Sequence, residues 1–144
     1  MSREPLRGRE SYRIWRDVTT RWADNDAYGH VNNTVYYAWF DTAVNAWLIE
    51  QGLLEIAAGD PIGLVVETGC RYARPLAYPE PVELGLAIES VGKSSVVYRL
   101  GAFAKNDTEA AAEGRFVHVY VGRDSRRPVD LPASWRRKFE EVAD

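Results

Sequence analysis

The chain has 144 residues, of which 46% are hydrophobic and 12% aromatic. That length fits a single domain, and that much apolar material excludes an intrinsically disordered chain. A formal net charge of −3 argues against a general nucleic-acid or membrane-surface binder, and a single cysteine, Cys70, excludes an internal disulfide.

The N-terminal region divides into a tail and a first strand. Residues 1–10 are charged and contain proline and glycine, so we expect a loosely held tail. Alternation of polar and apolar residues then predicts a half-buried strand over residues 12–22. The apolar residues that share one face of this strand are Tyr12, Ile14, Val18 and Trp22.

A polar turn and a long hydrophobic helix come next. The turn, residues 24–29, contains two aspartates and a glycine, and it is followed by apolar residues at three- and four-residue steps. Either Asn32 or Asn33 can cap the start of this helix, and Gly52 suits the left-handed residue that ends one. Three polar residues interrupt the apolar surface: Asp41, Asn45 and Glu50. A helix that is apolar nearly all round must be wrapped by other elements.

Four further strands and a second helix complete the chain. Alternating hydrophobicity predicts strands at residues 62–73, 82–89, 95–105 and 113–121, and a short amphipathic helix at residues 132–143. The strand at 113–121 carries apolar residues on both faces, so we expect both faces to be at least partly covered. On the strand at 62–73, the residues expected to share one face are Leu64, Val66, Thr68, Cys70 and Tyr72.

The order of these elements predicts an α+β fold in one domain spanning residues 1–144. Short turns between strands imply antiparallel neighbours, and one face of a curved antiparallel sheet can cover the long helix. A single sheet leaves two free edges and an outer face, so we expect protomers to pair.

The residues best suited to chemistry lie in the turn DNDAYGHVNN, residues 24–33. Two carboxylates stand just before a helix N-terminus, whose free N–H groups carry partial positive charge. This combination suits acyl transfer, because a carboxylate can attack or activate water while backbone N–H groups stabilise an oxyanion by about 3 kcal/mol per donor. On spacing alone, however, an aspartate at such a place is more often a helix cap.

The same region carries a family pattern. The segment RWADNDAYGHVNN, followed by VYYAWFD, resembles the signature of the 4-hydroxybenzoyl-CoA thioesterase-like branch of hotdog-fold acyl-CoA thioesterases. The segments YARPLAYPEPV, VGKSS and RRPVDLP extend the resemblance over nearly the whole chain. The resemblance implies a hotdog fold, in which a curved antiparallel sheet wraps around a long central helix. It also implies a homodimer or homotetramer with active sites at the interface between two chains.

The resemblance assigns roles to particular residues. Asp26 matches the catalytic carboxylate, acting as nucleophile or as general base, and the backbone N–H of Asn33 matches the donor that polarises the thioester carbonyl. Asp24 is expected to be a turn or cap residue. Tyrosines can line an acyl pocket, serines can bond to the pantetheine arm, and cations are needed for the phosphates of coenzyme A. The expected substrate-binding residues are Tyr28, His30, Tyr36, Arg74, Lys93, Ser94 and Ser95.

The expected reaction is hydrolysis of an acyl-CoA to a carboxylic acid and free CoA, without a metal or an organic cofactor. No second histidine or cysteine lies near Asp24, Asp26 and His30 in the sequence to complete a metal site. Two alternatives stay open: a thioesterase for acyl groups on acyl carrier protein, and a non-catalytic acyl-CoA-binding protein. A cytoplasmic location is expected, because there is no signal-peptide-like run and no stretch of roughly 18 apolar residues.

Overall fold

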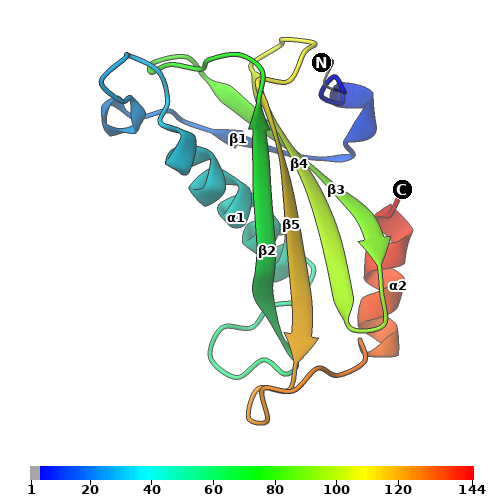
Figure 1. The fold of residues 1–144 in the computed structure, drawn as a ribbon. Coiled ribbons are helices and arrows are strands. Elements are labelled where there is room, and N and C mark those ends of the chain that lie inside the picture. The colour runs from blue at the N-terminus through cyan, green and yellow to red at the C-terminus, as the bar shows by residue number, and fades with distance from the viewer. Residues whose placement is uncertain (1–3) are drawn as a thin grey trace.

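A five-stranded antiparallel sheet curves around one long helix in the computed structural model, which describes residues 4–144 (Figure 1). The strands in sheet order are β1, β3, β4, β5 and β2, so β1 and β2 form the two edges. This is the predicted α+β arrangement of a hotdog fold. The elements are η1 (Arg9–Ser11), β1 (Ile14–Val18), η2 (Trp22–Asp24), α1 (Asn33–Glu50), β2 (Ile62–Tyr72), β3 (Val82–Val91), β4 (Ser95–Ala104), β5 (Ala112–Val121) and α2 (Ala133–Val142).

Helix α1 begins and ends where its caps predict. The side chain of Asn32 accepts a hydrogen bond from the backbone N–H of Thr34 at 2.9 Å, so Asn32 is the N-cap. Just past the other end, Gly52 adopts a φ of 72°, in the left-handed region that favours glycine. The buried side chains of α1 are Tyr36, Trp39, Phe40, Ala43, Val44, Trp47 and Leu48.

A glycine on β5 lets α1 lie close to the sheet. A Cβ atom added to Gly114 would lie 2.5 Å from Cδ2 of Phe40, which is fully buried. No side chain larger than hydrogen fits at this position without displacing the aromatic ring. Gly114 therefore sets the spacing between the helix and the concave face of the sheet.

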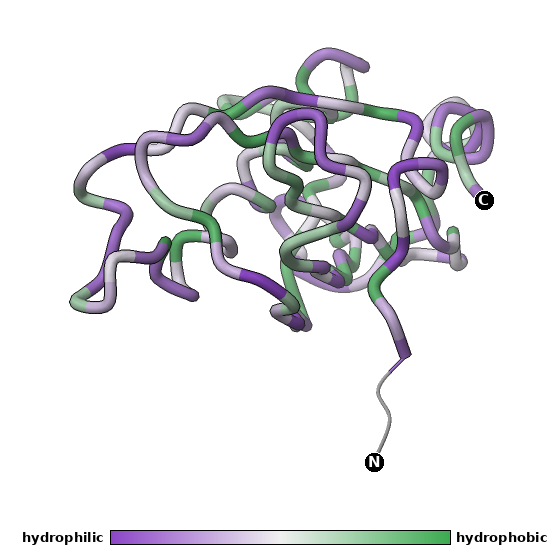
Figure 2. The backbone as a smooth tube through the Cα atoms, turned by 90° about the horizontal axis from the view of Figure 1, so that it is seen from above, coloured by the Kyte–Doolittle hydropathy of each residue, from purple (hydrophilic) through white to green (hydrophobic). Residues whose placement is uncertain are grey.

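The strands alternate between a concave face toward α1 and a convex face, and hydrophobic and hydrophilic residues accordingly mix along the chain (Figure 2). The predicted alternation on β3 is confirmed: the residues buried in the core are Val82, Leu84, Leu86 and Ile88. On β2 the predicted face is confirmed for Thr68, Cys70 and Tyr72, but Leu64 lies on the opposite face because the register shifts between Val65 and Glu67. Val65 lies opposite His118 and Thr68 lies opposite Phe116, so both face the helix. A β-bulge inserts one extra residue and breaks a strict alternation.

The first strand is shorter than predicted. Strand β1 pairs only with β3, and its last pair joins Val18 to Val82, directly after Pro81. Proline has no backbone N–H to donate to a ladder, so the pairing does not continue beyond this point. Tyr12, expected on the same face as Ile14, packs instead against Phe103 on the convex face.

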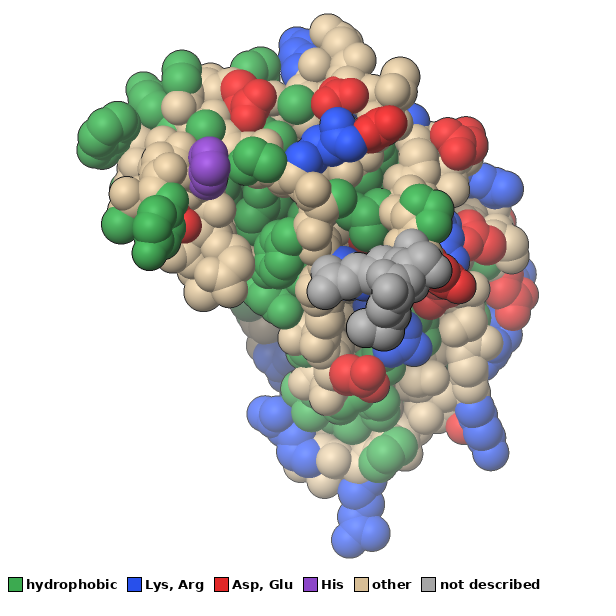
Figure 3. All heavy atoms as spheres, turned by 45° about the horizontal axis from the view of Figure 1, so that its top comes forward, with side chains coloured by type: hydrophobic (Ala, Val, Ile, Leu, Met, Phe, Trp, Pro, Cys, Tyr) green, Lys and Arg blue, Asp and Glu red, His purple; other side chains and the backbone are tan. Residues whose placement is uncertain are grey.

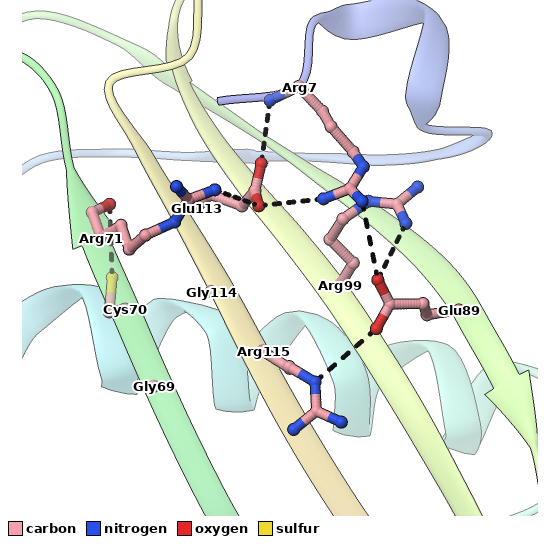
Figure 4. A pocket seen from close by; sticks show the side chains of 9 residues that line it. All are labelled: Arg7, Gly69, Cys70, Arg71, Glu89, Arg99, Glu113, Gly114 and Arg115. Atoms are coloured by element: carbon pink, nitrogen blue, oxygen red, sulfur yellow. Dashed lines mark hydrogen bonds and ion pairs between the residues drawn. The ribbon is translucent and has the colours of Figure 1, made fainter. Parts of the chain in front are cut away.

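The convex face is covered by charged side chains and by the N-terminal segment. The guanidinium groups of Arg7, Arg71, Arg99 and Arg115 surround the carboxylates of Glu89 and Glu113 (Figure 4). We expected residues 1–10 to be a loosely held tail. Residues 1–3 lie outside the described part of the chain, but Arg7 bonds to Glu113 through its backbone N–H at 2.9 Å.

The second helix closes one end of the concave side. It covers nearly the predicted residues, and its Phe139 is fully buried against the rings of Trp47, Tyr98 and Tyr120. Within residues 4–144, neither helix is long and apolar enough to cross a membrane.

Candidate active site

The turn before α1 closes on itself through backbone bonds. The backbone N–H of Asp26 donates to the carbonyl of His30 at 2.8 Å, and the N–H of Gly29 donates to the carbonyl of Asp26 at 3.1 Å. Gly29 has a φ of 80°, which glycine adopts without strain. The N–H of Tyr28 donates to one carboxylate oxygen of Asp26 at 2.8 Å, and this bond fixes the direction of the carboxylate.

Asp24 ties this turn to the helix and to Arg21, three residues earlier in the chain. Its buried carboxylate accepts bonds from the backbone N–H of Arg21 at 2.8 Å and from Nε and Nη2 of the same arginine at 3.0 and 2.8 Å. Its carbonyl accepts from the N–H of Asn32 at 2.8 Å. These contacts are those of a turn residue, as the sequence predicts. The Asp24 side chain is buried, so its carboxylate is not accessible to a substrate.

A second segment, residues 73–80, supports the turn from the side. The N–H of Val31 donates to the carbonyl of Leu76 at 2.8 Å, and the N–H of Tyr78 donates to the side-chain oxygen of Asn25 at 3.0 Å. The segment that follows β2 is thereby held beside the start of α1. Side chains from residues far apart in the sequence meet at this point.

A cavity of about 360 Å³ lies where these segments meet. This volume is within the range of small-molecule sites. Five of the nine predicted site residues line it together with Tyr72: Asp26, His30, Asn33, Tyr36 and Arg74. Hydrophobic side chains gather at the same end of the molecule (Figure 3), and the most exposed are Trp22 and Tyr28.

The start of α1 forms part of the wall of this cavity. Asn33 is the first residue of the helix, so its backbone N–H has no acceptor within the helix. The helix dipole adds partial positive charge at the same place. Asp26 and Asn33 thus line one cavity, and a carboxylate beside the start of a helix is an arrangement suited to a developing oxyanion.

Two tyrosines complete the cavity. Burial raises the pKa of Tyr36 to about 12; its hydroxyl, protonated at neutral pH like that of any tyrosine, can donate. The hydroxyl of Tyr72 donates to the carbonyl of Asn33 at 3.0 Å and joins the first turn of α1 to strand β2. Tyr72 is absent from the residues predicted for the site. The signal that could have found it is the segment YARPLAYPEPV, of which Tyr72 is the first residue and Arg74 the third.

Four predicted residues lie outside this cavity. Tyr28 belongs to the turn, but its side chain is 86% exposed and does not line the cavity. The other three occupy the turn between β3 and β4 and its border: Lys93, Ser94 and Ser95. Ser95 pairs with Val119, near the end of β5 opposite to the end that pairs with Tyr72. Within one chain, the structure does not bring this turn to the cavity.

Arg74 is the cation of the cavity, and it forms an ion pair with Glu109. Both side chains are substantially exposed, so the pair is in contact with solvent. Within residues 4–144, no group of three or more His, Cys, Asp or Glu side chains is placed to hold a metal ion.

Comparison with known proteins gives the family. The chain belongs to the thioesterase-like superfamily, whose model matches residues 20–139. It is similar to the solved PA5185 protein of Pseudomonas aeruginosa, with 50% identity, a TM-score of 0.90, and coverage of 95% of this chain and 96% of that chain.

Two further solved structures resemble the chain less closely in sequence. A thioesterase from Thermus thermophilus, complexed with coenzyme A and Zn, has 26% identity, a TM-score of 0.78, and coverage of 92% of this chain and 96% of that one. A 1,4-dihydroxy-2-naphthoyl-CoA thioesterase from Synechocystis has 18% identity, a TM-score of 0.80, and coverage of 89% and 96%; this likeness concerns the fold alone. No curated protein matches the chain.

Proposed function

We propose that this protein is a cytoplasmic acyl-CoA thioesterase of the 4-hydroxybenzoyl-CoA thioesterase-like branch. The observation that carries the proposal is that Asp26 and Asn33 line one cavity: the Asp26 carboxylate is held by the N–H of Tyr28, and Asn33 is the first residue of α1. Membership of the thioesterase-like superfamily supports this chemistry. The Thermus relative, described as a thioesterase complexed with coenzyme A, supports CoA as the carrier.

In the proposed reaction, water cleaves the thioester between the acyl carbon and sulfur. Acting as general base, Asp26 removes a proton from water while the water oxygen attacks the acyl carbon. Acting as nucleophile, Asp26 attacks the acyl carbon itself, and water then cleaves the mixed anhydride. In both cases the carbonyl oxygen becomes an oxyanion that the Asn33 N–H stabilises before the C–S bond breaks. In the base route the leaving sulfur takes the proton held by Asp26; in the nucleophile route CoA leaves as the thiolate and takes a proton from the water that cleaves the anhydride. No metal or organic cofactor takes part.

Other cavity residues bind the substrate in this proposal. Tyr36 and His30 line the same cavity as Asp26 and contact the acyl group, and Arg74 supplies a cation for a phosphate of coenzyme A. Its present partner, Glu109, is exposed and can release the guanidinium to the ligand at small cost.

A second copy of the chain completes the proposed site. Strand β2 is a free edge, and it exposes Leu64, Val65 and Val66 by 36%, 48% and 58%. An unpaired edge with exposed apolar side chains favours pairing with another strand. Antiparallel pairing of two β2 strands would bring the β3–β4 turn of one protomer, with Lys93, Ser94 and Ser95, toward the cavity of the other. The proposed assembly is thus a homodimer, alone or within a homotetramer.

The test is release of free thiol from matched acyl groups carried by coenzyme A and by acyl carrier protein. We expect turnover of acyl-CoAs, with a higher kcat/KM than for the same acyl groups on the carrier protein. Preference for the carrier protein would contradict CoA as the carrier. Tight binding of acyl-CoAs with no thiol release would contradict an enzymatic function and would identify a binding protein.

A further inference from the structure

A hydrogen bond joins the end of β2 to the start of α1. The hydroxyl of Tyr72 donates to the carbonyl of Asn33 at 3.0 Å, and both residues line the candidate active-site cavity. Tyr72 is the last residue of an edge strand, whereas Asn33 is the first residue of the helix. Among residues 4–144, this is the only hydrogen bond between β2 and the first turn of α1, residues 33–36. The edge of the sheet therefore holds the helix start through one side chain.

The first turn of α1 leaves the amide of Asn33 open. The N–H of Thr34 donates to the side chain of Asn32 at 2.9 Å, and the N–H of Val35 donates to the carbonyl of Asn32 at 3.0 Å. Asn33 is the first helical residue, so its own N–H has no acceptor within the helix. A donor to an oxyanion acts over about 3 Å, so its rate effect depends on where the backbone of Asn33 is held.

The ring of Tyr72 is itself held by the core. It meets the ring of Tyr36 edge to face, with centroids 5.2 Å apart and an interplanar angle of 75°. Tyr36 is 3% exposed, and it packs in the same manner on Trp39 with centroids 5.3 Å apart. Although Tyr72 is 41% exposed, its ring is thus anchored on a buried aromatic group. The bond to Asn33 accordingly links the first turn of α1 to a fixed support.

The Tyr72 hydroxyl is suited to holding a group in place and not to proton transfer. Burial raises the pKa of Tyr72 above that of an ordinary tyrosine. The hydroxyl therefore keeps its proton, and with it the bond to Asn33, up to a higher pH than an ordinary tyrosine would. A carboxylate base, in contrast, gains its proton in the acid range. A residue that only positions the helix should leave the pH dependence of the reaction unchanged.

We propose that Tyr72 is a positioning residue of the candidate active site, which holds the Asn33 backbone where its N–H meets the thioester oxygen. This role rests on the proposed thioesterase function and adds a residue that acts through Asn33 and not on the substrate itself. A misplacement of about 1 Å can cost about a hundredfold in rate. Because the cap formed by Asn32 still holds the turn, we expect loss of the Tyr72 bond to cost about tenfold.

The test compares free-thiol release from acyl-CoA by wild type and by Tyr72→Phe, which keeps the ring and removes the donor. We expect kcat to fall about tenfold and KM to stay within about twofold, because the bond affects the reacting geometry and not the binding of CoA. The pH profile of kcat should keep the apparent pKa of wild type. A shifted profile would overturn the inference, because Tyr72 would then take part in proton transfer.

Tyr78→Phe is the matched control. Tyr78 is 39% exposed and packs edge to face on Trp22, and its hydroxyl has no hydrogen-bond partner within residues 4–144. We expect Tyr78→Phe to keep the kcat of wild type. Equal kcat values for Tyr72→Phe and Tyr78→Phe would show that the bond to Asn33 does not position the donor.

A binding measurement separates this inference from the proposed function. A CoA thioether that carries a ketone presents a carbonyl oxygen but no thioester for water to cleave. We expect it to shift the amide ¹H signal of Asn33 downfield in wild type, and to shift it less in Tyr72→Phe. This difference without turnover of any acyl-CoA would refute hydrolysis and still support the positioning role. Equal shifts in the two proteins, or no shift in wild type, would overturn the inference whatever the turnover.

Discussion

The contact between Gly114 and Phe40 gives the most specific prediction for the fold. Replacing Gly114 by alanine places a Cβ 2.5 Å from one ring carbon and 2.7 Å from another, whereas ordinary contacts lie between 3.4 and 4 Å. The ring must therefore move by about 1 Å, although it is fully buried and packed against Tyr36 and Phe116. Overpacking of this kind costs about 2 kcal/mol, so we expect the free energy of unfolding in urea to fall by that amount.

The matched control is Gly69→Ala, one strand away on β2. A Cβ there meets nothing within 4 Å, and the substitution stiffens the unfolded chain, so stability should stay equal or rise by about 0.5 kcal/mol. A shift of α1 by Gly114→Ala should also lower kcat up to about a hundredfold, because Asn33 would move relative to Asp26. Equal stability of the two variants would refute the claim that Gly114 sets the spacing between helix and sheet.

Three further predictions concern single side chains. Asp24→Asn should lower the free energy of unfolding by about 2 kcal/mol, because a buried carboxylate that accepts three hydrogen bonds loses its charge. Arg21→Gln should lower it less, because the Arg21 side chain is 74% exposed. Equal losses of the two variants in urea denaturation would contradict this account. Because the pKa of His118 is lowered to about 4 by burial, the unfolded chain binds more protons between pH 6.5 and 4, so wild type should lose about 3 kcal/mol of stability as pH falls through this window. His118→Leu should lack that loss. If wild type and His118→Leu lost the same stability between pH 6.5 and 4, the lowered pKa of His118 would be disproved. Arg74→Gln should raise KM for acyl-CoA severalfold with kcat nearly unchanged, whereas Glu109→Gln, which frees the guanidinium, should leave KM equal or lower. Steady-state kinetics at low and high salt measure both values. An unchanged KM for Arg74→Gln, or a raised KM for Glu109→Gln, would contradict the role of Arg74.

The parts of the fold that depend on local interactions could be predicted from the sequence. The alternation that buries Val82 to Ile88 and the cap formed by Asn32 each involve only neighbouring residues. The end of β1 at Val18 and the bulge after Val65 could not be predicted in this way. Both depend on the partner strand, through the position of Pro81 and through the register with β5.

The same division applies to the site. Asp26, His30 and Asn33 lie within eight consecutive residues, so one motif was enough to bring them together. Tyr72 belongs to the segment YARPLAYPEPV, but its bond to the carbonyl of Asn33 arises only when β2 packs beside α1, so its role in the site could not be predicted from the sequence.

The catalytic role of Asp26 is the central claim, and thiol release from acyl-CoA by Asp26→Asn tests it most directly. The substitution keeps the side-chain shape and the acceptor for the Tyr28 N–H but removes the charge that attacks or activates water. We expect kcat to fall by at least about a hundredfold, with urea unfolding and oligomeric state unchanged from wild type. Turnover within a few-fold of wild type in a folded variant would contradict the assignment of Asp26 as the catalytic carboxylate.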